Sequence, residues 1–75
     1  MPYKTNKDLP ENVTNVLPPH AQDIYRETFN NAWREYADPE KRFDEGDSRE
    51  DTARKVAWAA VKHKYEKIHD EWIEK

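Results

Sequence analysis

The feature that most constrains the fold is a helical pattern that runs uninterrupted from Ser48 to Trp72. At about 100° of rotation per residue, its apolar side chains cover an arc of roughly 200°, wider than the stripe of an ordinary surface helix. Ser48 and Asp51 match a capping box, which marks the start of the helix. A helix with so wide an apolar arc needs neighbours on two sides. We therefore expect it to be the central helix of a small bundle, ending at about Trp72.

A second long helical pattern lies between His20 and Pro39, where proline ends it. Its apolar and small side chains recur every three or four residues, which places them on one face. The other side is polar, so we expect this helix to pack one face on the C-terminal helix. The predicted packing face comprises Ala21, Ile24, Tyr25, Thr28, Phe29, Ala32, Trp33 and Tyr36.

Residues 8–17 have the pattern of a shorter helix of about two turns. Pro10 fits its first turn, where a missing N–H costs nothing. Val13, Val16 and Leu17 fall on one face, and Leu17 must end the helix because a residue before proline is pushed out of the α region.

Residues 1–7 show no period, although Tyr3 and Thr5 fit a short strand. The predicted fold class is therefore all-α, allowing for a minor N-terminal strand pair. It is a small bundle of one short and two long helices with the C-terminal helix central. Aliphatic residues are scarce, so aromatic rings must supply much of the core. The residues expected to share that core are Phe29, Trp33, Trp58, Val61 and Tyr65.

Length and composition exclude several classes of protein. Seventy-five residues suffice for one domain, 1–75. The absence of cysteine excludes disulfides and zinc–thiolate sites, which fits a reducing cytosol. The longest apolar run, Val56 to Val61, is six residues, whereas spanning a bilayer takes about 20. No apolar segment typical of a secretory signal follows the basic residues at the N-terminus. We expect a cytoplasmic protein.

Charge is unevenly distributed along the chain. From Asp38 to Asp51, seven acidic and three basic residues give a net charge of −4. From Arg54 to Lys67, five basic residues and one acidic residue give +4. The chain is therefore dipolar in sequence although its overall net charge is −3.

Metal sites are disfavoured by the spacing of the candidate ligands. His63 and His69 are about 240° apart around a helix, so they point different ways. If Gly46 were the glycine of a calcium-binding EF-hand loop, its first and last ligands would be Lys41 and Thr52, which do not fit. We expect neither metal nor cofactor.

Catalysis is equally disfavoured. There is no cysteine, Ser48 serves as a helix cap, and no glycine-rich loop is present to hold phosphates. Glu66 and Asp70 lie on the polar side of a predicted helix, where solvation leaves carboxylates ordinary. The prediction is a protein that is not an enzyme and has no catalytic residues.

Nucleic-acid binding is the alternative function that the charges keep open. This hypothesis rests on a set of basic residues in the C-terminal helix. These basic residues do not form one stripe along the helix. Lys55 and Lys62 face away from the apolar arc, while Lys64 and Lys67 project from within or beside it. The full set is Arg54, Lys55, Lys62, Lys64 and Lys67.

Two segments carry a resemblance to a known family. The pattern LP-x-x-V-x-x-x-LP-x-HA-x-x-IY-x-x-x-FN-x-AW-x-x-Y spans Leu9 to Tyr36, and ARKVAWAAVKHKY spans Ala53 to Tyr65. The sequence resembles the ChaB family in both, and the opening MPYKT is similar to bacterial members. The resemblance implies a compact helical fold and a role in regulating cation transport, in association with a sodium/calcium–proton antiporter of the inner membrane. It brings no catalytic or ligand-binding residues to transfer.

The favoured hypothesis is therefore a cytoplasmic monomer that binds the cytoplasmic face of such an antiporter without catalysis. Peripheral contact with the inner membrane is compatible with it. Acidic residues suit the positively charged cytoplasmic loops of a membrane protein, and exposed lysines suit lipid headgroups. The residues expected to bind the partner are Asp44, Glu45, Asp47, Lys55 and Lys62.

Overall fold

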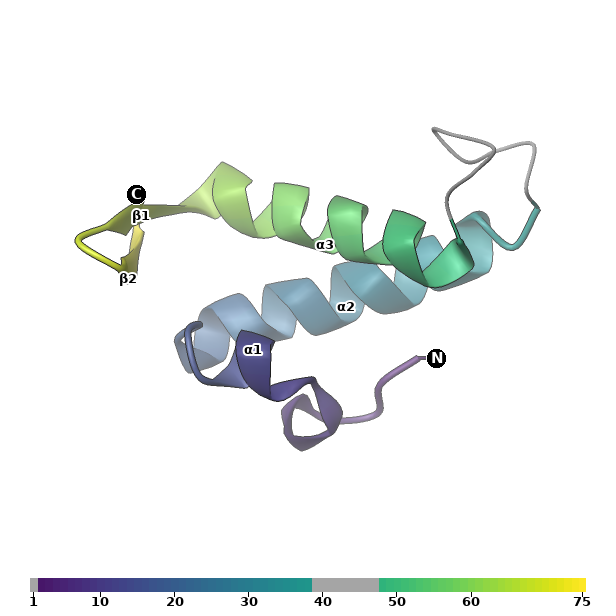
Figure 1. Ribbon diagram of the computed structural model, residues 1–75, viewed down its shortest axis with the longest axis horizontal. Coiled ribbons are helices and arrows are strands. Elements are labelled where there is room, and N and C mark those ends of the chain that lie inside the picture. The colour runs from purple at the N-terminus through teal and green to yellow at the C-terminus, as the bar shows by residue number, and fades with distance from the viewer. Residues whose placement is uncertain (1, 39–47) are drawn as a thin grey trace.

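The computed structural model describes residues 2–38 and 48–75. Within them, two long helices lie side by side and run in opposite directions, and a strand pair closes the C-terminal end (Figure 1). The elements are the 3-10 helix η1 (Asn6–Asp8), α1 (Glu11–Thr14), α2 (Pro19–Glu35), α3 (Arg49–Lys64), β1 (Tyr65–Ile68) and β2 (Glu71–Glu74). The expected set of one short and two long α-helices is confirmed for these residues.

Helix α2 is the central element of the described structure. It packs along α3 and also contacts η1 and α1, which lie below it in Figure 1. The prediction that the C-terminal helix is central is wrong. The buried residues of α3 include Ala53, Ala57 and Val61, whereas Trp58 on the same wide arc is half-buried. Alanine residues widened the apolar arc that the sequence predicts. Alanine is the best helix former, so its presence on the arc does not require a second helix packed against it.

The prediction that the C-terminal helix continues to Trp72 is also wrong. Helix α3 ends at Lys64, and the chain turns into an antiparallel hairpin in which Tyr65 pairs with Glu74. The two turn residues, His69 and Asp70, have φ angles of 50° and 66°. Positive φ at both central residues matches the twist of a two-residue β-hairpin. The strand pair therefore lies at the C-terminal end of the chain.

No strand forms near the N-terminus among the described residues, which corrects the expectation for Tyr3 and Thr5. The side-chain amide of Asn30 on α2 takes the place of a neighbouring strand. Its Oδ1 accepts the backbone N–H of Tyr3 at 2.8 Å, and its Nδ2 donates to the carbonyl of Tyr3 at 2.7 Å. The ring of Tyr3 packs 4.8 Å from that of Phe29, between centroids.

The short helix α1 is shorter than predicted. Pro10 occupies its N-cap position and Thr14 is its last residue. Leu17 is still buried, but Val16 lies beyond the helix and is 44% exposed. One turn is enough because it places Val13 in the core, and further turns would have to end before Pro18 in any case.

The ends of the two long helices are joined by side-chain contacts. The Ser48 hydroxyl accepts the backbone N–H of Asp51 at 3.0 Å, which confirms the predicted cap of α3. Beside it, Arg49 donates from Nε to the carbonyl of Trp33 at 2.6 Å. The Arg49 guanidinium also lies 4.2 Å from the centre of the Trp33 ring. The guanidinium thus covers part of the half-buried Trp33 ring in a cation–π contact.

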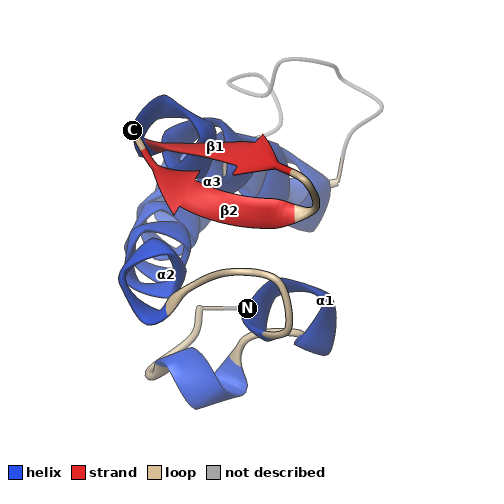
Figure 2. Ribbon diagram, turned by 90° about the vertical axis from the view of Figure 1, so that its left-hand side faces the viewer, coloured by secondary structure: helices blue, strands red, loops and turns tan. Residues whose placement is uncertain are grey.

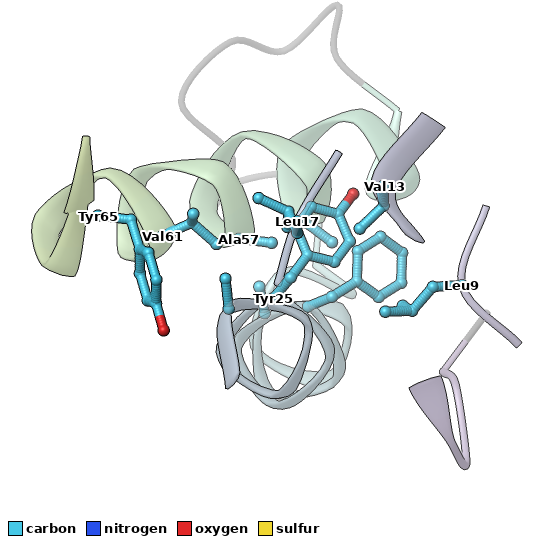
Figure 3. Close-up of a cluster of buried hydrophobic side chains, with 11 residues drawn as sticks. Leu9, Val13, Leu17, Tyr25, Ala57, Val61 and Tyr65 are labelled. Carbon is cyan, nitrogen blue, oxygen red and sulfur yellow. The ribbon is translucent and has the colours of Figure 1, made fainter. Parts of the chain in front are cut away.

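The core runs between α2, α3 and the N-terminal elements (Figure 3). Of the five residues expected to share it, Phe29, Val61 and Tyr65 are buried, and Trp33 and Trp58 pack against it while half-buried. Phe43, which the sequence also offers as a core contact from the connection between the two long helices, lies outside the described residues. The buried apolar residues are Leu9, Val13, Leu17, Ala21, Tyr25, Phe29, Ala32, Ala53, Ala57, Val61 and Tyr65.

Candidate functional site

The residues predicted to bind a partner divide into two groups. Asp44, Glu45 and Asp47 lie outside the described residues. Lys55 and Lys62 are both exposed on α3. Seven residues make about two helical turns, so these two lysines lie on the same side of the helix.

The wider basic set is divided between α3, which carries Arg54, Lys55, Lys62 and Lys64, and β1, which carries Lys67. Arg54 Nη2 lies 3.5 Å from a carboxylate oxygen of Glu50, and Arg54 Nη1 lies 3.6 Å from one of Asp51. These exposed pairs contribute little to stability, but they place two carboxylates beside the arginine. A phosphate backbone approaching Arg54 would meet negative charge there. Lys62 and Lys64 are exposed on the same helix, so nucleic-acid binding stays a prediction that the structure does not test.

The C-terminal hairpin has two chemically different faces. Its register places Tyr65 and Trp72 on one face, because Tyr65 pairs with Glu74 and Lys67 with Trp72. Tyr65 is buried, and the Trp72 ring lies 5.7 Å from that of Trp58 on α3. This inner face therefore packs against the helices. Figure 2 shows the hairpin lying in front of α3 with its broad side toward the viewer.

The opposite face, which we call the outer hairpin face, consists of Glu66, Ile68, Glu71 and Ile73. Glu66 pairs with Ile73 and Ile68 with Glu71, so the two isoleucines are diagonal neighbours and so are the two glutamates. Ile68 is 39% exposed and Ile73 is 43% exposed. In the described part of the chain, neither glutamate has an ion-pair partner. This arrangement offers an apolar centre flanked by negative charge.

Sequence reasoning missed the outer hairpin face because it placed these residues on a continuous helix. Two signals were available. Ile68, Trp72 and Ile73 favour strands, and the intervening His69 and Asp70 belong to the few residue types that tolerate positive φ. Glu and Lys are good helix formers and obscured both signals.

Two tyrosines in or beside the core have pKa values raised further above neutral pH. Burial raises the pKa of Tyr25 to about 12, with a smaller contribution from Tyr3. Partial burial also raises the pKa of Tyr3. A general acid or base acting near pH 7 needs a pKa near that value, so neither tyrosine is suited to that role.

Two further features of residues 2–38 and 48–75 concern metal ligands and membrane spans. No group of three or more His, Cys, Asp or Glu side chains there is placed to hold a metal ion. None of the helices described is long and apolar enough to cross a membrane. His69 lies in the hairpin turn, and His63 lies near the end of α3.

Comparison with known proteins places most of the chain in one family. The family model described as ChaB matches residues 9–75. Relatives include the "Putative cation transport regulator ChaB" of Escherichia coli strain K12 and the protein of the same name from Shigella flexneri. Each is 63% identical over 76 aligned residues, covering 100% of this chain and 99% of the relative.

A solved structure agrees with the same assignment. It is an NMR solution structure of a protein with that same name, and it has a TM-score of 0.81 to this chain at 63% identity. The match covers 99% of both chains. The helical fold described above is therefore similar to one determined by experiment.

Proposed function

Because the chain belongs to the ChaB family, we propose that it regulates cation transport, the role stated in the names of its relatives. The proposed mode of action is binding without catalysis. The partner would be a sodium/calcium–proton antiporter of the inner membrane, contacted on its cytoplasmic face. This chain would act as a monomer from the cytoplasm, with peripheral contact at the membrane.

The observation that carries this proposal is the outer hairpin face. Ile68 and Ile73 are two of the three large apolar residues that are exposed in the described structure, and they lie together. Apolar side chains that gather on a surface mark sites of interaction more often than scattered ones do. The inner face, which packs on Trp58, holds the hairpin in place for binding. A preformed face loses less conformational entropy on association.

The charge of the outer hairpin face indicates the kind of partner. Glu66 and Glu71 flank the isoleucines, so the face complements a segment with cationic and apolar residues. The cytoplasmic loops of membrane proteins carry an excess of lysine and arginine. Such a loop fits the face, and the expected interaction is stronger at low salt.

The small size of the face also bears on the mode of binding. A standard interface buries about 800 Å² per partner, more than four side chains on a hairpin can supply. Ile68 and Ile73 would form the apolar centre of the interface, and the hairpin edges would form its polar rim. Lys55 and Lys62, which are exposed on α3, remain the second candidate surface for the partner or for lipid headgroups. A modest, reversible affinity suits a regulator.

The test measures binding of the full chain to the purified antiporter in lipid nanodiscs, with transport followed in proteoliposomes. The double variant I68T/I73T keeps β-branched residues in the strands and should weaken binding at least tenfold. V16T makes a matched apolar-to-hydroxyl change at an exposed site away from the hairpin and should bind normally. E66Q/E71Q should reduce the salt dependence of binding. Absence of saturable binding at low salt, with transport unchanged, would refute the proposal.

A further inference from the structure

A surface depression lies where the N-terminal residues meet the first two turns of α2. Its volume is about 430 Å³, and it is open to solvent. It is separate from the outer hairpin face. The residues that line it are Lys4, Thr5, Asn6, Lys7, Asp23 and Arg26.

Hydrogen bonds fix the positions of three residues that line this depression. Arg26 Nε donates to Asn6 Oδ1 at 2.8 Å, and Asn6 Nδ2 donates to Asp23 Oδ1 at 2.7 Å. Arg26 Nη2 lies 3.9 Å from the same Asp23 oxygen. The Arg26 side chain is 23% exposed. A guanidinium fixed in this way is partly preorganised, so it loses little freedom when it binds an anion.

The charge of the depression is opposite to that of the whole protein. Lys4, Lys7 and Arg26 supply three positive charges, and Asp23 supplies one negative charge, in a chain of net charge −3. Asp23 already accepts the amide of Asn6. Lys4 and Lys7 are exposed, and the described part of the chain gives them no ion-pair partner.

One neighbouring acidic group lies outside the lining of the depression. Asp8, the acidic residue closest in sequence, directs its Oδ2 toward the backbone N–H of Thr5 at 3.2 Å and the Thr5 hydroxyl at 3.3 Å. Its carboxylate therefore serves to fold η1 and does not line the depression. Two exposed ammonium groups are left to face a ligand, beside a guanidinium that shares part of its charge with Asp23.

We propose that this depression binds a phosphate group. The planar guanidinium of Arg26 supplies directed donors that match phosphate oxygens, and Lys4 and Lys7 supply mobile positive charges. Asn6 positions Arg26 through the 2.8 Å hydrogen bond. The phosphate can belong to a free phosphate compound or to the headgroup of an anionic phospholipid, since both present the same oxygens. The inference does not depend on the proposed antiporter contact.

The first experiment titrates the ¹⁵N-labelled full chain with inorganic phosphate at low ionic strength, with sodium chloride added to a parallel sample at equal ionic strength. The expected result is a saturable set of amide shifts confined to residues 4–7 and 23–26. In K4Q/K7Q the affinity should fall about tenfold. K55Q/K62Q removes the same charge from α3 and should leave the affinity unchanged.

The second experiment identifies the source of the phosphate. Cosedimentation is measured with vesicles of phosphatidylglycerol in phosphatidylcholine and with vesicles of phosphatidylcholine alone. Binding to the anionic vesicles that K4Q/K7Q abolishes and K55Q/K62Q retains assigns the site to headgroups. Saturable phosphate shifts without vesicle binding assign it to free phosphate compounds.

Two results would overturn the proposal. One is the absence of local, saturable binding in both experiments. The other is an equal loss of binding in K4Q/K7Q and K55Q/K62Q, which would show attraction to exposed lysines in general. Antiporter binding is measured separately through I68T/I73T, so failure of either proposal can be told from failure of the other.

Discussion

Trp58 and Trp72 join the hairpin to the helices: their ring centroids lie 5.7 Å apart with the planes inclined at 32°. Trp58 also meets Tyr25 of α2 edge-on, at 5.3 Å and 71°. One indole thus connects both long helices and the second strand. Aromatic pairs at such distances contribute about 0.5–1.5 kcal/mol beyond the area that they bury.

Replacing these two tryptophans should have unequal effects. W58A removes contacts to both Tyr25 and Trp72 and should lower the free energy of unfolding by about 3 kcal/mol. W72A removes the hairpin contact alone and should cost about 1–2 kcal/mol. Urea unfolding followed by circular dichroism measures both. Equal costs would show that the contact of Trp58 with the central helix contributes nothing.

The hairpin turn should be improved by residues that favour positive φ. His69 and Asp70 have φ angles of 50° and 66°, where asparagine and glycine are preferred. H69N/D70G should therefore raise the free energy of unfolding by about 1 kcal/mol. Amide exchange in β1 and β2 should slow in parallel. A decrease in stability would mean that the turn does not adopt this conformation in solution.

Thr52 should tolerate the loss of its hydroxyl. It is fully buried, and its Oγ1 has no hydrogen-bond partner in the described structure. An unpaired buried hydroxyl costs about 1–3 kcal/mol, so T52V, which keeps the shape, should stabilise the protein by about 1 kcal/mol. T52S keeps the hydroxyl and removes a methyl group, so it should destabilise. A loss of stability in T52V would show that the hydroxyl is hydrogen-bonded in solution.

Alkaline pH should unfold the protein through Tyr25. Its pKa is about 12 in the folded state and about 10 in the unfolded chain, so the folded state holds the phenolic proton more tightly. The resulting stability is fully present below pH 10 and is lost as pH rises from about 10 to about 12, by up to about 3 kcal/mol. Tyrosinate absorbance and circular dichroism should change together over that range.

The variant Y25F supplies the control for this prediction. It lacks the titrating group, so its stability should fall less steeply above pH 10 than that of the natural chain. Part of the dependence should persist because the pKa of Tyr3 is raised as well. Identical profiles for the two proteins would exclude Tyr25 as the cause.

The sequence predicted the helical elements better than their ends or their arrangement. Periodicity identified the α2 face, since Tyr25 and Phe29 are buried as expected, and the cap at Ser48 was correct. Periodicity did not predict the hairpin, because Glu66 to Glu74 consists largely of residues that are compatible with a helix. The stacking of Trp72 on Trp58 is a tertiary contact, and such contacts override local propensity.

The candidate site was less predictable than the fold for a related reason. Whether Ile68 and Ile73 face the core or the solvent depends on strand register, which a helical assignment cannot give. The depression proposed to bind phosphate depends on two hydrogen bonds: Asn6 donates to Asp23, 17 residues away, and accepts from Arg26, 20 residues away. No local sequence pattern predicts such long-range contacts. The resemblance to a family indicated a role but carried no residues with it.

The pairing of Asn30 with the backbone of Tyr3 makes one side chain a latch for the beginning of the chain. If the Asn30 amide released the backbone of Tyr3, the Tyr3 ring would separate from Phe29 and buried aromatic surface would be exposed to water. The same release would carry Lys4 away from Arg26. Asn30 thus shares with Asp23 and Arg26, which bind Asn6, the task of ordering this edge of the molecule, and displacement of Asn30 alters packing and surface charge in one step.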